Sequence, residues 1–165
     1  MNPFETLYRD YRDDVYHFLL KLTSYQTDLA EELTQETFYQ AILSFGRFRG
    51  GCHVKTWLCQ IAKNVYYKKV RKSRREEEYV KTVAQQQLPD AGKIAESAEF
   101  SATVLQVIQR FDTKTKDVML YRLFADLPYR QISALLEISE ESARVIFSRG
   151  KVKLRNELYK EGYMV

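Results

Sequence analysis

The sequence predicts an all-α protein made of two small helical domains joined by a flexible linker. Hydrophobic residues make up 45% of the 165 residues, which is enough for a packed core. The chain has only 6 Gly and 3 Pro, too few turn-forming residues for many short strands. Apolar residues recur at three- and four-residue spacing through most of the chain, as expected for amphipathic helices.

Three helices are expected in the N-terminal part, over residues 4–22, 27–44 and 54–71. Glycines predict a loop over 47–53. The candidate apolar positions of the second helix are Leu29, Leu33, Phe38, Ala41, Ile42 and Phe45. The inward stripe of the third helix comprises Val54, Trp57, Leu58, Ile61 and Val65, and its opposite side carries Lys55, Cys59, Lys63, Tyr66 and Tyr67.

Residues 73–96 are interpreted as a linker, because a charge run, a glutamine run and a turn-like Leu-Pro-Asp-Ala-Gly replace the periodic pattern. The chain is thereby divided into domains of residues 1–72 and 97–165. The second domain is expected to hold helices over 97–111, 114–125 and about 129–136, and then a long last helix.

Residues 129–155 have the layout of a helix-turn-helix: a short helix, a three-residue turn and a basic second helix. Ser139 is a suitable N-cap for that second helix. Glu137 occupies the turn position often held by glycine, and a left-handed conformation there costs about 1 kcal/mol. An ordinary helical hairpin is the alternative interpretation.

Charge is distributed in blocks. Residues 47–75 contain ten basic residues and no acidic one, and residues 144–160 contain six basic residues and one acidic. The segments 1–46 and 76–143 each have a net charge of −5. This pattern predicts contact with a polyanion at two places, with the acidic segments facing solvent or a protein partner. The alternative is a pair of solvated helical faces.

Aromatic residues are interleaved with the cations of the first basic block. Tyr66 and Tyr67 are candidates for stacking on unpaired bases, whereas Trp57 on the inward stripe is better explained as core. The glycine-containing loop before the helix could let a flipped base approach the backbone.

Catalytic chemistry is not expected. Cys52, His53 and Cys59 match no standard metal spacing, and no phosphate-binding or dinucleotide loop is present. No cofactor or metal is therefore predicted. The sequence also shows no membrane-spanning apolar run and no signal peptide, which predicts a cytoplasmic protein without membrane insertion.

Three segments resemble bacterial RNA polymerase sigma factors of the sigma-70 family. Residues 28–41, DLAEELTQETFYQA, resemble the stretch that binds core polymerase. Residues 48–64, FRGGCHVKTWLCQIAKN, resemble the segment that recognises the −10 promoter element, and 129–155 resembles the −35 reading motif. The short two-domain chain is similar to the extracytoplasmic-function (ECF) group.

The resemblance implies an alternative sigma factor that binds core RNA polymerase, directs it to promoters and promotes −10 melting. The positions matching the core-binding surface are Leu33, Gln35, Glu36 and Phe38. The positions matching the family's pocket for a flipped −10 base are Phe48, Arg49 and Asn64; the helical wheel adds Lys55, Lys63 and Tyr66. The positions matching −35 contacts are Arg144, Val145, Ser148 and Arg149. Expected partners are core polymerase, promoter DNA at both elements and an anti-sigma factor.

The sequence departs from the family pattern at a few positions. Glu32 stands where Asp is usual, and Val145 and Ile146 stand where Ser and Arg are common. Apolar contact with thymine methyl groups, or plain packing, is expected at 145 and 146 instead. Two other function classes remain open: a free-standing helix-turn-helix regulator and a metal-dependent nucleic-acid enzyme.

Overall fold

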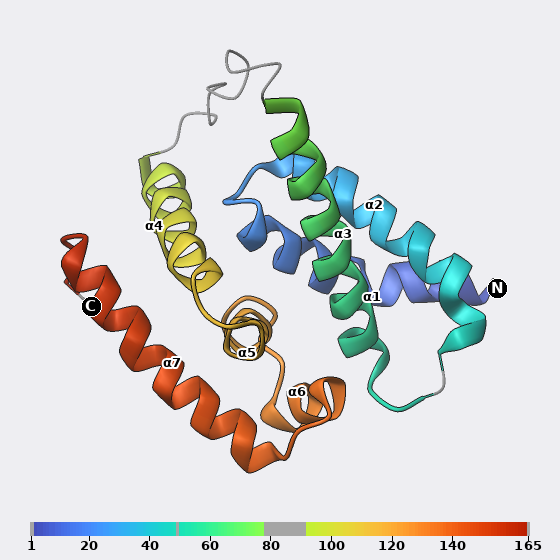
Figure 1. Ribbon diagram of the computed structural model, residues 1–165. Coiled ribbons are helices and arrows are strands. Elements are labelled where there is room, and N and C mark those ends of the chain that lie inside the picture. The colour runs from blue at the N-terminus through green and yellow to red at the C-terminus, as the bar shows by residue number, and fades with distance from the viewer. Residues whose placement is uncertain (1, 49, 78–91, 165) are drawn as a thin grey trace.

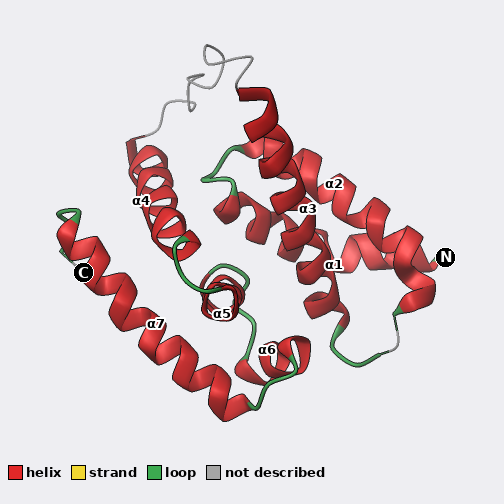
Figure 2. Ribbon diagram, in the orientation of Figure 1, coloured by secondary structure: helices red, strands yellow, loops and turns green. Residues whose placement is uncertain are grey.

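The computed structural model describes residues 2–48, 50–77 and 92–164, and every regular element within them is a helix (Figure 2). In chain order the elements are α1 (Pro3–Leu22), α2 (Thr27–Ser44), the short 3-10 helix η1 (Phe45–Arg47), α3 (Val54–Glu77), α4 (Gly92–Gln109), α5 (Thr113–Leu123), α6 (Tyr129–Leu136) and α7 (Glu140–Lys160). The all-α prediction is confirmed. No described helix is long and apolar enough to cross a lipid bilayer.

Helices α3 and α4 extend into the predicted linker from both sides. Residues 73–77 continue α3 and residues 92–96 begin α4, while 78–91 lie outside the described residues. Lys, Arg and Glu are strong helix formers, so α3 continues beyond the end of its apolar stripe. A helical start of the linker agrees with this charged composition, although the apolar periodicity ends before it.

Helices α1, α2 and α3 pack into a bundle (Figure 1). Asn2 caps α1 by accepting a hydrogen bond from Phe4 N at 3.0 Å, and Pro3 suits the first helical turn. Thr34 and Thr37 of α2 are buried, and each hydroxyl donates to the carbonyl four residues earlier, at 2.6 and 2.7 Å. These bonds satisfy the two hydroxyls, so α2 can turn a partly polar face into the core.

In the second group of helices, α7 lies across α4, α5 and α6. Gly150 permits the close approach of α7 to α5, because a Cβ there would lie 2.5 Å from Met119 Sδ. Ser139 caps α7 by accepting from Ser142 N at 3.0 Å, as predicted. Glu137 adopts φ 56° in the turn before it, at the position that glycine often holds. The short helix, the three-residue turn and the long helix follow each other as the predicted helix-turn-helix layout requires.

The two groups of helices also contact each other. Helix α1 packs against α4, and α3 packs against α6. Phe18 of α1 and Tyr121 of α5 are both buried, with ring centroids 6.4 Å apart. The buried apolar residues of both groups form one continuous cluster. The two predicted domains therefore share a core in this arrangement.

Candidate protein and nucleic-acid interfaces

The predicted polymerase-binding set on α2 splits between the core and the surface. Gln35 and Glu36 are exposed, whereas Leu33 is only 2% and Phe38 only 5% exposed. The ring of Phe38 packs edge-on against Tyr8 of α1, with centroids 5.0 Å apart. In this structure Leu33 and Phe38 hold α2 in the bundle and offer no surface to a partner, because they lie on the side of α2 that faces α1 and α3.

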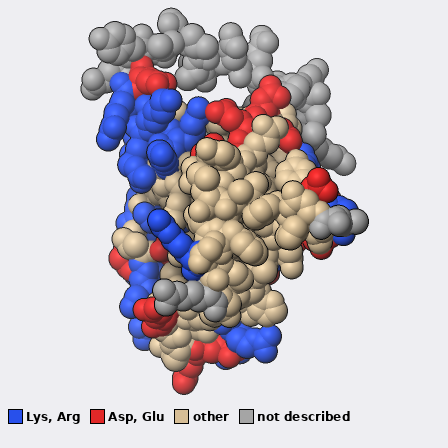
Figure 3. Space-filling model, turned by 90° about the vertical axis from the view of Figure 1, so that its right-hand side faces the viewer, with Lys and Arg blue, Asp and Glu red and all other residues tan. Residues whose placement is uncertain are grey.

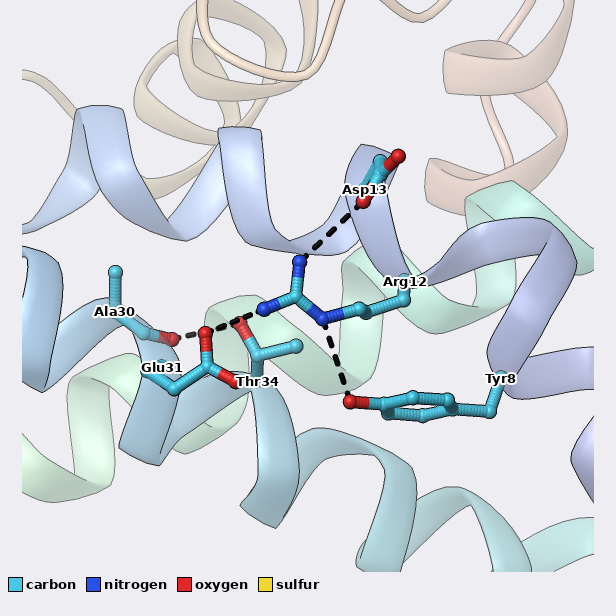
Figure 4. A network of polar contacts seen from close by, with 6 residues as sticks. All are labelled: Tyr8, Arg12, Asp13, Ala30, Glu31 and Thr34. Carbon is cyan, nitrogen blue, oxygen red and sulfur yellow. Dashed lines mark hydrogen bonds and ion pairs between the residues drawn. The ribbon is translucent and has the colours of Figure 1, made fainter.

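A polar network fixes α2 against α1 (Figure 4). The guanidinium of Arg12 donates to Glu31 across the two helices, and to Tyr8 Oη and Asp13 Oδ1 at 3.3 Å each. Tyr8 thus contacts both Arg12 and the buried Phe38. This network links α2 to α1 at the surface of the bundle.

The outer face of α2, which also includes Gln35 and Glu36, carries large apolar side chains that no sequence motif indicated. Tyr39 is 56% exposed and Leu43 is 62% exposed, and Ile42 follows at 45%. Of the candidate apolar positions, Ile42 lies on this exposed face, and Phe45 lies in η1, where it packs on Phe4 and Trp57. Figure 3 shows a broad uncharged face on this side of the molecule. The sequence could have indicated this exposed apolar surface, because the apolar residues of α2 lie on more than one side of the helix.

The loop before α3 is organised by aromatic rings. Phe48 is half-buried and lies on Trp57, with ring centroids 4.8 Å apart, and Phe45 lies 6.4 Å from the same indole. Phe4 continues this cluster 5.5 Å from Phe45. Arg49 lies outside the described residues. Phe48 therefore lies beside the start of α3, packed on Trp57.

The face of α3 predicted to be outward is covered. Cys59 is fully buried, and Lys63 and Asp117 of α5 form an ion pair at 3.0 Å in which both side chains are 13% exposed. Tyr66 lines a cleft between α3 and α4, where burial raises its pKa to about 12. Lys55 is partly exposed and lies 4.0 Å from Asp14. Placing Lys63 and Tyr66 on a solvent face was therefore wrong, because α3 packs against both groups of helices.

Asn64 lies on a different, exposed side of α3. It lines a groove of about 440 Å³ between α2 and α3, together with Gln40 of α2 and Lys68 of α3. Lys69 bridges the two helices through an ion pair with Glu32 at 3.2 Å. Phe48 does not line this groove, so the structure does not bring the predicted partners Phe48 and Asn64 into one pocket.

A row of exposed residues continues from Asn64 toward the end of α3. We call it the α3 stripe; it comprises Asn64, Lys68, Arg71, Lys72 and Arg75. The spacing of three and four residues places these side chains on one side of the helix. Figure 3 shows Lys and Arg side chains gathered near the top of the molecule, the level at which α3 ends in Figure 1. Of the residues predicted for −10 binding, Asn64 belongs to this stripe, whereas Lys63 and Tyr66 lie on the covered side of α3.

On α7 the four predicted residues are exposed together: Arg144, Val145, Ser148 and Arg149. Arg144 donates to Glu140 at 2.6 Å and lies 5.4 Å from the centre of the Tyr129 ring. Arg122 lies over the same ring at 4.4 Å. The guanidinium of Arg144 thus lies between Glu140 and the Tyr129 ring at the surface of α7.

The residues that a metal enzyme would need are dispersed. Among the described residues, no group of three or more His, Cys, Asp and Glu is placed to hold a metal ion. Cys59 lies in the core, where burial raises the pKa of its thiol to about 12, while Cys52 is partly exposed. His53 uses its backbone N–H to donate to Gln131 of α6 at 3.1 Å.

Comparison with known proteins gives consistent matches along the chain. The family model for sigma-70 region 2 matches residues 7–76, and that for sigma-70 region 4 matches residues 101–154. The chain is 26% identical over 162 residues to the ECF RNA polymerase sigma factor SigM of Bacillus subtilis, covering 96% of each. It is 25% identical over 166 residues to the RNA polymerase sigma factor YlaC of the same organism, covering 96% of this chain and 94% of that protein.

Two solved structures share the fold. CnrH, in complex with the cytosolic domain of CnrY, matches with a TM-score of 0.65 and 17% identity over 96% of this chain and 89% of that chain. The sigma factor RpoE of Bartonella quintana, in complex with the anti-sigma factor NepR, matches with a TM-score of 0.62 and 21% identity over 99% and 100%.

Proposed function

We propose that three exposed surfaces of this ECF sigma factor each make a different contact during transcription initiation. The chain belongs to the sigma-70 family and directs core RNA polymerase to promoters. The observation that carries the proposal is that both family matches coincide with these surfaces. Region 2 includes the outer face of α2 and the α3 stripe, and region 4 includes the exposed half of α7. The chemistry of RNA synthesis stays with the polymerase.

The outer face of α2 is the proposed contact with core polymerase. Gln35 and Glu36 supply polar groups, and Tyr39 and Leu43 supply apolar area next to them. Aromatic residues surrounded by polar groups are typical of the residues that dominate binding energy at protein interfaces. Leu33 and Phe38 contribute by holding this face in shape.

The α3 stripe is the proposed path of the −10 strand. Its cations attract the phosphate backbone, and Asn64 can donate and accept hydrogen bonds to a base in the groove beside it. An extruded base held there would help to keep the duplex open. Replacement of Asn64 by Ala should reduce permanganate reactivity of the −10 thymines while −35 binding stays unchanged. Equal reactivity in both proteins would remove Asn64 from this role.

The exposed half of α7 is proposed to read the −35 element. Arg144 and Arg149 are positioned for bases or phosphates, and Val145 is positioned for a thymine methyl group. If Arg144 reads a guanine, Arg144→Ala costs about 1–3 kcal/mol and relaxes preference at one base pair. If it contacts only phosphate, binding weakens for all sequences and the salt slope falls by about one.

An anti-sigma protein is a further proposed partner. The support is that both solved structures described above are complexes, one of them explicitly with an anti-sigma factor. Action on core polymerase and promoter DNA implies work in the bacterial cytoplasm. No cofactor is needed for any of the proposed contacts.

Run-off transcription with purified core polymerase tests the proposed function. Start sites that appear only when this protein is added would support it. The second candidate, a free-standing helix-turn-helix regulator, accounts for α6 and α7 but leaves the region 2 match without a role. That candidate predicts DNA binding without polymerase and no new start sites.

A further inference from the structure

The ring of Tyr129, at the start of α6, is contacted from both neighbouring helices. It packs edge-on against Phe147 of α7, which is 7% exposed, with ring centroids 5.9 Å apart. The guanidinium of Arg122 of α5 lies 4.4 Å from the ring centre, and the same group donates a hydrogen bond to Leu127 O at 3.1 Å. A buried side chain and a hydrogen-bonded cation therefore restrict the orientation of this ring.

Arg144 of α7 is a second cation at the same ring. Its guanidinium carbon lies 5.4 Å from the ring centre, which is within the range of a cation–π interaction. Its Nη2 donates to Glu140 Oε1 at 2.6 Å, and within the described residues its Nε and Nη1 make no hydrogen bond. The side chain is thus contacted at two points, while two of its nitrogen atoms keep their donors available.

These contacts place the guanidinium at the end of α7 that a helix-turn-helix directs toward bases. Glu140 is the first residue of α7, and the N-terminal residues of the second helix contact base edges in this motif. Arginine reads guanine by aiming two donors of its planar group at O6 and N7. An arginine that already lies against a ring and a carboxylate loses less side-chain freedom when it makes that contact.

The contacts of Tyr129 involve its ring and not its hydroxyl group. Within residues 2–48, 50–77 and 92–164 no hydrogen bond involves this hydroxyl group, whereas Arg122, Arg144 and Phe147 all contact the ring. Phenylalanine offers a similar ring face to a cation, and leucine offers none. Substitutions by these two residues therefore separate a role of the ring from a role of the hydroxyl group.

Resting on the proposed reading of the −35 element by α7, we infer that Tyr129 is a positioning residue for sequence recognition. Its ring holds the guanidinium of Arg144 toward one guanine, and Tyr129 acts through Arg144 without reading a base itself. A cation–π contact at an exposed site corresponds to about two- to fivefold in affinity. Loss of the ring should therefore weaken discrimination at the base pair that Arg144 reads, and leave the other −35 positions unchanged.

Competition binding with core polymerase carrying the full chain tests this inference. The DNA is a promoter mapped by run-off transcription, with a variant for each base pair of its −35 element. Tyr129→Leu should lower discrimination about two- to fivefold at the same base pair where Arg144→Ala relaxes it, and Tyr129→Phe should retain it. Tyr159→Leu is the matched control, because it removes an exposed tyrosine ring from the last turn of α7, far from Arg144, and should behave as the wild type.

A double-mutant cycle separates positioning from a general effect on the fold. If Tyr129 acts through Arg144, adding Tyr129→Leu to Arg144→Ala should change discrimination no further. A further loss of the same size in that background, or a loss spread evenly over all base pairs, would overturn the inference, because either result means that Tyr129 only holds the helices together. Circular dichroism checks the fold of each variant, and Tyr129→Met replaces Tyr129→Leu in the cycle if the latter is unfolded.

The same measurements distinguish this inference from the proposed function. Start sites that depend on the wild type support the function, whatever the variants show. Unchanged discrimination in Tyr129→Leu, or an Arg144→Ala variant that keeps its preference at every base pair, would overturn the positioning role alone. The absence of new start sites with the wild type would overturn the proposed function itself.

Discussion

Phe38 and Tyr39 are neighbours on α2, but Phe38 is buried and Tyr39 is exposed. We therefore expect Phe38→Ala to reduce stability and Tyr39→Ala to reduce binding to core polymerase. Phe38 is 5% exposed and packs on Tyr8, so truncation leaves a cavity between α1 and α2. Buried Phe→Ala changes cost about 3–5 kcal/mol. For a chain of this size the loss lowers the melting temperature by about 6–20 °C. Tyr39 is 56% exposed, so its truncation changes the free energy of unfolding by less than about 0.5 kcal/mol.

Tyr39→Ala should weaken binding to core polymerase more than Phe38→Ala does, when both are measured at a temperature at which they remain folded. Tyr39→Ala removes an exposed aromatic from the proposed contact and should weaken binding about 30-fold, the effect of an interface residue worth about 2 kcal/mol. Thermal denaturation and a fluorescence titration with core polymerase measure the two quantities. The reasoning is refuted if Tyr39→Ala binds like the wild type while Phe38→Ala keeps its melting temperature and loses polymerase binding.

Three further predictions concern packing, pH and thiol reactivity. Gly150→Ala should lower the melting temperature, because overpacking against Met119 costs about 1–3 kcal/mol and exceeds the gain of about 1 kcal/mol in helix propensity; an unchanged or higher value would contradict the close approach. Asp112 caps α5, and hydrogen bonds from Thr115 hold the pKa of its carboxyl group below the usual value. The ionised carboxylate therefore stabilises the fold above about pH 4, and this stabilisation is lost as the pH falls through the lowered pKa. Urea unfolding should therefore show that Asp112→Ala lowers the free energy of unfolding less at pH 3 than at pH 7, where we expect a loss of about 1 kcal/mol. Alkylation of the native protein near pH 8 should modify Cys52 and spare the buried Cys59 thiol, whose pKa is raised to about 12; mass spectrometry showing rapid modification of both would place Cys59 outside the core.

Local features of the fold were predictable because they depend on residues close together in the sequence. The helix-turn-helix turn is an example. Ser139 caps α7, and this follows from the side chain at one position. Glu137 takes the left-handed conformation at the position in the turn that glycine often holds. The exposed set on α7 was predictable for the same reason, since Ala143 and Phe147 fix which side of that helix is buried.

The environment of Lys63 could not be predicted in this way. Periodicity distinguishes an apolar stripe from a polar one, but it does not tell a polar face in water from a polar face against another domain. The partner of Lys63 is Asp117, which belongs to the other group of helices, and nothing local to α3 indicates it. The α3 stripe lies on the side that remains exposed after both packings.

The motif on α2 shows a different limit. A resemblance identifies the segment that acts in a family, but it does not say which side chains face a partner and which hold the helix in place. Leu33 and Phe38 belong to the second kind here, and Tyr39 and Leu43 belong to the exposed kind. The exposed fraction of each side chain distinguishes the two roles, and it is known only once the packed structure is known.

Permanganate reactivity of a promoter mapped by run-off transcription tests the central claim, that this protein opens promoters as a subunit of RNA polymerase. The DNA is probed with the protein alone, with core polymerase alone and with both together. We predict reactive thymines at the −10 element only when both are present, together with protection of the −35 element that depends on Arg144. Protection of the −35 element by the protein alone, with no reactive thymines after core polymerase is added, would contradict the account and favour a free-standing DNA-binding regulator.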